Sequence, residues 1–201
     1  VPLEQRVPVY ETNNWASVTL MRKDYPDPVP DDAYFARLTG SSTKMDMAIG
    51  RVTIQTIDDA ENFIRKTEKY ETSSDAGSWR AKAVFITDDR YYNDTKRSDP
   101  INHLIDSENE VERLDSRLLV DKLYSHVYPY NTISGGQRRK PDFEKQIVDA
   151  FNSGAVIISY AGHGNPNVWT NESVLSVPST INKFSNFNRL PFTTTATCDF
   201  S

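Results

Sequence analysis

The chain has 201 residues, of which 37% are hydrophobic, 25% charged and 11% aromatic, and its formal net charge at pH 7 is −5. This composition argues against a disordered chain, and no apolar run reaches the roughly 18 residues of a membrane-spanning helix. The acidic charge, without a stripe rich in Lys and Arg, argues against nucleic acid as a partner because phosphate binding draws on clustered positive charge.

The first third of the chain predicts little regular structure. Three prolines make residues 25–35 a predicted loop, and residues 47–54 are typical of a strand. Residues 58–71 predict a helix capped by Asp58. The apolar face of this helix comprises Ala60, Phe63, Ile64 and Thr67. The run "TSSDAGS" at 72–78 breaks the pattern, so we expect a boundary between two subdomains there.

Strands and helices alternate after this boundary. The predicted strands cover residues 82–87, 123–128, 155–160 and 191–197. The first predicted helix covers 107–121, with Val111, Leu114 and Leu118 on one face. The second covers 142–153, with Phe143, Ile147 and Phe151 on one face, and ends at Gly154. A third, weaker helix is predicted within 172–186. The alternation predicts an α/β fold with a parallel sheet and helices on both faces. The β-branched runs at 155–160 and 191–197 are typical of buried central strands.

A histidine between two glycines follows the strand at 155–160, in the run "YAGHGN". Glycine allows backbone conformations closed to other residues and lets another molecule approach the main chain closely. His163 and Cys198 each lie just past the carboxyl end of a predicted strand, where sites gather in open parallel sheets. A short crossover often makes such strands neighbours, about 4.8 Å apart. The two side chains would then suit nucleophilic acyl transfer.

In that reaction, the imidazolium of His163 favours the thiolate of Cys198 and then protonates the leaving amine. The backbone N–H groups of Gly164 and Cys198 are candidates for an oxyanion hole. An alternative stays open, since a lone cysteine at the end of a core strand is more often a packed thiol. Zinc is disfavoured because the only histidines, His103, His126 and His163, are not spaced as a ligand pair, so no metal site is predicted.

The segments "ISYAGHGNPNVW" and "NRLPFTTTATCDF" resemble the catalytic core of the gingipain-type cysteine peptidases, which share the caspase-like fold. The upstream "MDMAIGRVTIQTIDDAENFIRKTEKYE" resembles another segment of the same family. The resemblance covers roughly residues 30–201. It implies a caspase-like, parallel-sheet three-layer sandwich with helices on both faces. Residues 1–72 would be the end of a non-catalytic first subdomain, and 78–201 the catalytic subdomain, truncated after the nucleophile.

The resemblance also implies roles for individual residues. It maps the catalytic dyad onto His163 and Cys198, and the oxyanion donors onto the backbone of Gly164 and Cys198. A supporting acid follows the first strand of the catalytic subdomain in this family, and Asp88 or Asp89 occupies that place here. The family's acidic specificity residue does not align cleanly, which leaves specificity for Arg or Lys open.

Within the family, "SGGQRRKPD", the GHG run with Trp169 and Glu172, and "TATCDFS" look most like the signal peptidase or sortase of the type IX secretion system. That likeness implies an exported enzyme at the outer membrane or cell surface. It would remove C-terminal sorting domains from exported cargo and work beside other secretion-system components. Trp169 and Glu172 are candidates for the substrate pocket. The resemblance requires no cofactor and is compatible with a structural calcium ion.

Two alternatives stay open. One is a secreted endopeptidase of the same family, and the other is a catalytically silent caspase-like scaffold in which Cys198 is buried and unreactive. The chain begins without Met and ends three residues after Cys198, so we expect it to be a piece of a larger protein. Family members continue past the cysteine into segments that build the substrate cleft, which leaves open whether this chain alone is active.

Overall fold

The computed structural model of the chain describes residues 10–12, 29–39, 44–91 and 102–198. The chain divides into two compact units, Val1–Phe63 and Ile64–Ser201. The boundary expected at residues 72–78 concerns the family's subdomains and stays a prediction.

The first unit contains a short antiparallel strand pair and a turn of 3-10 helix. Strand β1 (Glu11–Thr12) pairs with β2 (Val29–Pro30), and the 3-10 helix covers Asp32–Ala36. The strand predicted at 47–54 is wrong. Among the described residues no other segment pairs with it, and its side chains are exposed, so neither a ladder nor a core holds it in a sheet.

Helix α1 (Ile57–Thr72) confirms the helix predicted at 58–71, but its predicted cap is wrong. The Thr56 hydroxyl accepts the N–H of Asp59 at 3.1 Å, and the Asp59 carboxylate accepts the N–H of Thr56 at 2.9 Å. This reciprocal pair works as a capping box, so Thr56 rather than Asp58 begins the helix. None of the residues on the predicted apolar face is buried.

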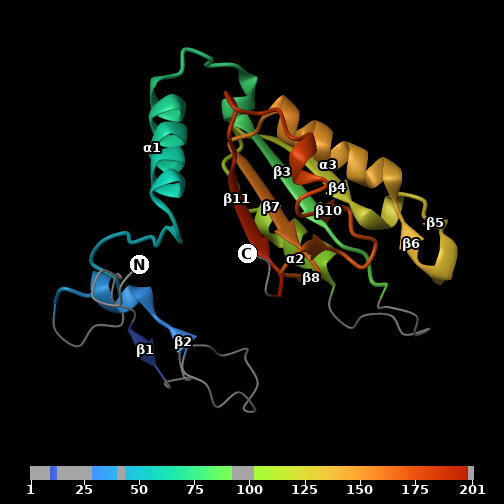
Figure 1. Cartoon of the computed structure of the whole chain (residues 1–201), viewed down its shortest axis with the longest axis horizontal. Coiled ribbons are helices and arrows are strands. Elements are labelled where there is room, and N and C mark those ends of the chain that lie inside the picture. Colours follow the sequence, from blue (N-terminus) through green and yellow to red (C-terminus); the bar gives the residue numbers. More distant parts are fainter. Residues whose placement is uncertain (1–9, 13–28, 40–43, 92–101, 199–201) are drawn as a thin grey trace. The chain divides into compact units, whose positions relative to one another are not determined.

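A four-stranded parallel sheet forms the centre of the second unit (Figure 1). Its strands are β3 (Lys82–Thr87), β4 (Leu119–Tyr124), β7 (Ile157–Ala161) and β11 (Phe192–Ala196). Their order across the sheet is β11-β7-β3-β4, and every pair is parallel. The carboxyl ends of the strands therefore meet at one edge of the sheet.

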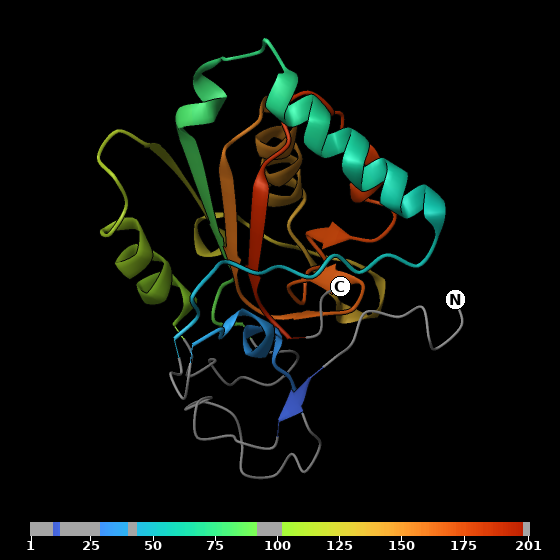
Figure 2. The same cartoon turned by 90° about the vertical axis from the view of Figure 1, so that its left-hand side faces the viewer.

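Helices cover both faces of this sheet (Figures 1 and 2). Helix α3 (Pro141–Ser153) buries Phe143, Ile147 and Phe151 in one core with inward-facing residues of β3 and β7. On the other face, Leu104 and Val111 from the two ends of α2 (His103–Val111) pack against a smaller cluster that includes Ala83 and Phe85. Gly154 ends α3 with a φ of 85°, as the sequence predicted. The expected α/β sandwich is confirmed.

The helix predicted at 107–121 lies earlier in the chain than expected. Turns closed by Leu114 N–H to Val111 C=O and by Leu118 N–H to Asp115 C=O follow α2. The apolar spacing is nevertheless meaningful, because Val111 and Leu114 both pack on the smaller core. The next strand consequently begins at Leu119 and ends at Tyr124, four residues before the predicted strand 123–128 does.

Two predictions near the carboxyl-terminal part also differ from the structure. Residues 172–186 hold no α-helix; Ser173 turns the chain with a φ of 57°, and Leu175–Ser176 form strand β10. Strand β11 is an edge strand rather than a buried central one: in the described residues it pairs with β7 alone, and all five of its residues are exposed. Its β-branched composition favours a strand without distinguishing edge from centre.

Shorter elements surround the carboxyl edge of the sheet. Strand β8 (Gly164–Asn165) forms a hairpin with β9 (Val168–Trp169), and β10 pairs with β9. A second hairpin joins β5 (Asn131–Thr132) to β6 (Arg138–Arg139). Of the 3-10 turns in this unit, Ser78–Ala81 directly precedes β3 and so lies at the opposite edge; the others cover Ser125–Val127, Ser134–Gly136 and Ile181–Lys183. In the described parts of the chain, no helix has both the length and the apolar character needed to cross a bilayer.

Candidate active site at the carboxyl edge of the sheet

The structure brings the segments of His163 and Cys198 to the same edge of the sheet. Ala161 of β7 is paired with Ala196 of β11, so His163 and Cys198 each stand two residues beyond a matched pair. The N–H of Gly162 donates to the carbonyl of Ala196 at 3.1 Å and prolongs the ladder. Cys198, the chain's single cysteine, is exposed. The expected adjacency of the two segments is found, and the reactive dyad stays a prediction.

Hydrogen bonds hold the main chain of His163 at both ends. Its N–H donates to the Asp88 carboxylate at 3.2 Å. Its carbonyl accepts the Tyr160 hydroxyl at 2.5 Å and the N–H of Thr170 at 2.9 Å. The imidazole ring meets the ring of His103 edge-on, with 5.4 Å between the centroids. The histidine therefore lies on a loop whose backbone is fixed by Tyr160 of β7 and by Asp88, which follows β3.

The glycines that flank His163 are explained by close packing within the chain. A Cβ at Gly162 would overlap the Tyr160 hydroxyl and the Cβ of Asp88, and a Cβ at Gly164 would overlap the Thr197 hydroxyl. Neither glycine is among those with positive φ. The sequence suggested unusual backbone conformation or approach by another molecule, whereas here the chain's own side chains take the space.

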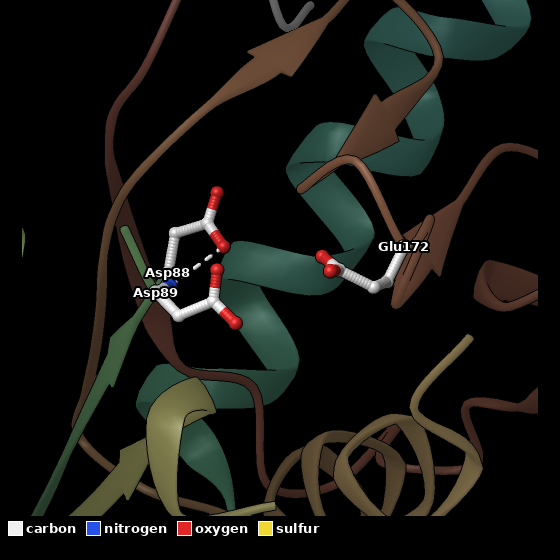
Figure 3. A group of neighbouring side chains, drawn as sticks. All are labelled: Asp88, Asp89 and Glu172. Atoms are coloured by element: carbon white, nitrogen blue, oxygen red, sulfur yellow. Dashed lines mark hydrogen bonds between the residues drawn. The ribbon is translucent and has the colours of Figure 1, made fainter. Parts of the chain in front are cut away.

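Three acidic side chains lie together beside this loop (Figure 3). Asp88 and Asp89 follow β3, and Glu172 follows β9, with its carboxylate pointing toward the two aspartates. One oxygen from each lies within 4.8 Å of the others. Asp88 is 4% exposed and Glu172 is 1% exposed. Carboxylate oxygens in such an arrangement suit a hard cation such as Ca²⁺. Basic side chains nearby also balance their negative charge.

Two basic side chains from the end of the β5–β6 hairpin enter the cluster. Lys140, 2% exposed, donates to Asp89 at 2.7 Å and to the carbonyl and hydroxyl of Ser125 at 2.6 and 2.7 Å. Arg138 lies 3.1 Å from Asp89 and, through Nε, 3.2 Å from Glu172. These bases supply two positive charges for three carboxyl groups. Both bases thus act as counter-ions to the carboxyl groups, and a structural calcium ion at this cluster stays a prediction.

The three carboxyl groups differ in their pKa because their surroundings differ. Burial, with repulsion from Glu172 and Asp89, raises the pKa of Asp88 to about 8. Burial would also raise the pKa of Asp89, but its contacts with Lys140 outweigh burial and lower it. Burial and repulsion from Asp89 raise the pKa of Glu172, against the attraction of Arg138. At neutral pH Asp88 is therefore mostly protonated.

Backbone strain borders Glu172. Thr170 and Ser173 have φ values of 60° and 57°, in the left-handed region that residues other than glycine rarely adopt. Each such residue costs about 1–3 kcal/mol and persists only where neighbours enforce it. Here the Thr170 N–H binds the His163 carbonyl, and its hydroxyl accepts the N–H of Glu172 at 3.2 Å. The strained turn thus ties the histidine loop to the carboxyl cluster.

The structure places the other predicted residues as follows. Trp169 is 1% exposed and stacks on Tyr160 with 4.1 Å between the centroids, and Glu172 is equally buried. In the described structure both side chains therefore lie inside the protein, and their part in a substrate pocket stays a prediction. Asp88 contacts the main chain of His163 and Asp89 pairs with Lys140, so the role of supporting acid also stays a prediction.

Sequence reasoning missed several residues of this site. The run "SGGQRRKPD" served only as part of the resemblance within the family, although its Arg138 and Lys140 form ion pairs with the cluster. Tyr160 was counted as strand composition alone. Its position two residues before Gly162, which must lack a Cβ, was the available signal. His103, considered only as a zinc ligand, contacts His163 instead.

Residues 4–201 match the model of peptidase family C25. The chain belongs to this family. It is 24% identical over 173 residues to gingipain R2 and to gingipain R1 of Porphyromonas gingivalis, covering 85% of this chain and 21% and 16% of those proteins. The chain thus spans about a fifth or less of these curated relatives. The predicted membership of the gingipain-like cysteine peptidase family is confirmed.

Solved structures of the family agree with the fold. The crystal structure of the Arg-specific cysteine proteinase gingipain R matches with a TM-score of 0.58 and 24% identity, covering 85% of this chain and 36% of that one. The complex of Porphyromonas gingivalis RgpB pro- and mature domains matches with a TM-score of 0.56 and 23% identity, covering 83% and 36%. These C25 structures confirm the caspase-like α/β fold.

Proposed function

We propose that this chain carries the reacting pair of a C25 cysteine peptidase, with Cys198 as the nucleophile and His163 as the general base and acid. The observation that supports this most directly is the register of β7 and β11, which puts both residues two positions beyond a matched pair. The exposed thiol is open to a substrate carbonyl. The fixed main chain of His163 favours a defined position for its ring.

The reaction begins when the imidazole of His163 takes the proton from the Cys198 thiol. The thiolate attacks the carbonyl carbon of the scissile peptide, and the resulting oxyanion accepts hydrogen bonds from the backbone N–H groups of Gly164 and Cys198. Collapse of this intermediate breaks the C–N bond, and the imidazolium gives its proton to the leaving amine. A thioester remains on Cys198. No cofactor is needed for these steps.

The fate of the thioester divides two forms of this proposal. In the first, the enzyme resembles PorU, removes C-terminal sorting domains from type IX secretion cargo, and passes the acyl group to water or to an amine acceptor. It would work with other secretion-system components at the outer membrane or cell surface. In the second, it is an exported endopeptidase, which the likeness to gingipains R1 and R2 favours. Cleavage of short Arg or Lys reporter peptides by a form that carries the whole protease supports the second, and cleavage restricted to cargo junctions supports the first.

Alkylation of Cys198 tests the dyad without any substrate. Because this is the chain's only cysteine, mass spectrometry reports its labelling by iodoacetamide unambiguously. In the wild type, we expect labelling to continue well below the pH of about 8.5 at which an ordinary thiol ionises. His163→Ala should abolish the labelling of Cys198 below that pH. The exposed His126 follows β4 at the same edge. His126→Ala is therefore the matched control, and it should leave the labelling of Cys198 at low pH unchanged.

The opposite outcome would remove the catalytic proposal. If wild type and His163→Ala label alike, with both profiles centred near pH 8.5, the two side chains do not act together. A silent scaffold would then be the better description of the chain, with a Cys198 that is unreactive although it is exposed rather than buried.

A further inference from the structure

The buried side chains of Asp88 and Tyr160 hold opposite ends of one residue. Asp88 Oδ2 accepts the N–H of His163 at 3.2 Å, while its other oxygen accepts the N–H of Asp89 at 2.7 Å. The Tyr160 hydroxyl donates to the carbonyl of His163. Asp88 is 4% exposed and Tyr160 is fully buried, so water does not compete readily for these groups.

We infer that Asp88 and Tyr160 are positioning residues that set the place of His163 through its main chain. This inference rests on the proposed function of His163, and it gives Asp88 a role different from that of an acid that acts on the imidazole. The hydrogen bonds that the structure shows for the Asp88 carboxylate come from the backbone N–H groups of His163 and Asp89. The carboxyl group is needed here as a hydrogen-bond acceptor.

The sheet explains why these two side chains are rigid. The N–H of Asp88 donates to the carbonyl of Ala161 at 3.0 Å, so its own backbone is fixed to the end of β7. The Tyr160 ring is clamped by the parallel stack on Trp169, with an interplanar angle of 6°. Gly162 lies between the two side chains and leaves them room by lacking a Cβ. Rigid support matters because a misplacement of about 1 Å can cost on the order of 100-fold in rate.

Protonation distinguishes this role from that of a charged supporting acid. With a pKa of about 8, Asp88 is mostly neutral at pH 7, and its carbonyl oxygen still accepts a hydrogen bond. Asparagine is neutral and keeps one acceptor oxygen, which serves the N–H of His163 when its amide group takes the place of the oxygen that accepts from Asp89. Burial and the proximity of Asp88 raise the pKa of Tyr160 well above its usual value, so the hydroxyl remains a donor. An asparagine at position 88 should therefore support His163, whereas an alanine should not.

Two readouts on the same variants test the inference. Amide hydrogen exchange at residue 163, followed by ¹⁵N NMR, reports the Asp88 hydrogen bond whether or not the dyad is reactive. We expect this amide to be protected in the wild type and in Asp88→Asn, and to exchange at least about tenfold faster in Asp88→Ala. Asp115→Asn is the matched control, because this exposed carboxylate binds Arg117 in a surface turn. It should leave exchange at residue 163 unchanged.

Alkylation of Cys198 at about pH 6 is the second readout. We expect Asp88→Asn to stay within about threefold of the wild type and Asp88→Ala to fall by about tenfold or more. Tyr160→Phe, which keeps the ring on Trp169 but removes the donor to His163, should fall between them. If Asp88→Ala does not fold, the asparagine and phenylalanine variants decide by the same measures.

The inference is overturned by any of three results. The first is an unprotected amide at residue 163 in the wild type. The second is unchanged exchange in folded Asp88→Ala, and the third is a loss of labelling in Asp88→Asn as large as in the alanine variant, which indicates a charged supporting acid. A wild type that labels like His163→Ala instead refutes the proposed function itself. The exchange data then still report whether the hydrogen bond exists, so the two failures are distinguishable.

Discussion

Adding one methyl group at Gly162 should damage both stability and the proposed site. In Gly162→Ala, the new Cβ would lie 2.5 Å from the Cβ of Asp88, 2.7 Å from Cζ of Tyr160, and closer still to the tyrosine hydroxyl. Carbon atoms in contact are normally about 3.5–4.0 Å apart, so one of these groups must move by about 1 Å. Tyr160 is fully buried against Trp169 and has little room to yield.

The expected loss follows from two terms. Overpacking a well-filled interior costs about 1–3 kcal/mol. Displacing the hydroxyl of the fully buried Tyr160 takes this donor away from the His163 carbonyl and leaves it unpaired, which costs about 1–3 kcal/mol more. The lower entropy of the unfolded alanine chain returns only about 0.4–1 kcal/mol. We expect Gly162→Ala to lower the free energy of unfolding by about 1–5.6 kcal/mol.

Urea unfolding followed by tryptophan fluorescence measures this loss, with a constant m-value as the check that the same transition is observed. Gly50→Ala is the matched control, because nothing lies within 4 Å of a Cβ at that position. It should change the free energy of unfolding by less than about 1 kcal/mol. A loss below about 1 kcal/mol for Gly162→Ala would show that the space around this glycine is not filled as described.

Three further perturbations have definite expected results. The pKa of Asp88 in the folded protein, about 8, exceeds its ordinary value of 3.8. The stability that its proton contributes is therefore complete below about pH 4 and is lost as the pH rises toward 8. In Asp88→Asn the urea midpoint should fall less over this pH range, and a fall as steep as in the wild type contradicts the raised pKa. Lys140→Met leaves Asp89 without its closest base and should cost about 3–5 kcal/mol in urea unfolding, unlike an exposed ion pair. Phe151→Ala leaves a cavity in the core under α3 and removes the stacking on Phe184. Calorimetry should show that the free energy of unfolding falls by about 3–5 kcal/mol, compared with about 1 kcal/mol or less for a surface substitution.

The elements that the sequence predicted well are those whose signals are local. Helix α3 combines Phe143, Ile147 and Phe151 at helical spacing with a glycine that adopts positive φ at its end. Strand β3 covers the predicted residues 82–87, five of them buried. In each case the residues that specify the element lie within it, so no knowledge of distant neighbours is required.

The predictions failed where a pattern reports burial rather than conformation. Leu114 lies at helical spacing from Val111 and packs on the same core, but it does so from a turn. Likewise, the threonine-rich run of β11 favours extended backbone wherever the strand stands in the sheet. Position in the sheet depends on the order of strands, which no single segment encodes.

The site shows the same division between local and distant information. The glycines around His163 are visible in the sequence, and the strand ends predict where it meets the segment of Cys198. The partners of Asp89 are not predictable in this way, since Arg138 and Lys140 are 49 and 51 residues away in the chain. Charge balance among buried groups is a property of the folded chain as a whole.

The two residues of the proposed dyad follow strands that differ in how many neighbouring strands hold them. His163 follows β7, which has a hydrogen-bonded neighbour on each side, whereas Cys198 follows β11, which in the described residues has one neighbour and five exposed side chains. Local opening takes place most easily where few buried contacts and few protected hydrogen bonds resist it. Fraying of β11 would carry the thiol away while the histidine loop stays in place. On heating, the low-pH reactivity of the thiol should therefore disappear before the sheet as a whole unfolds.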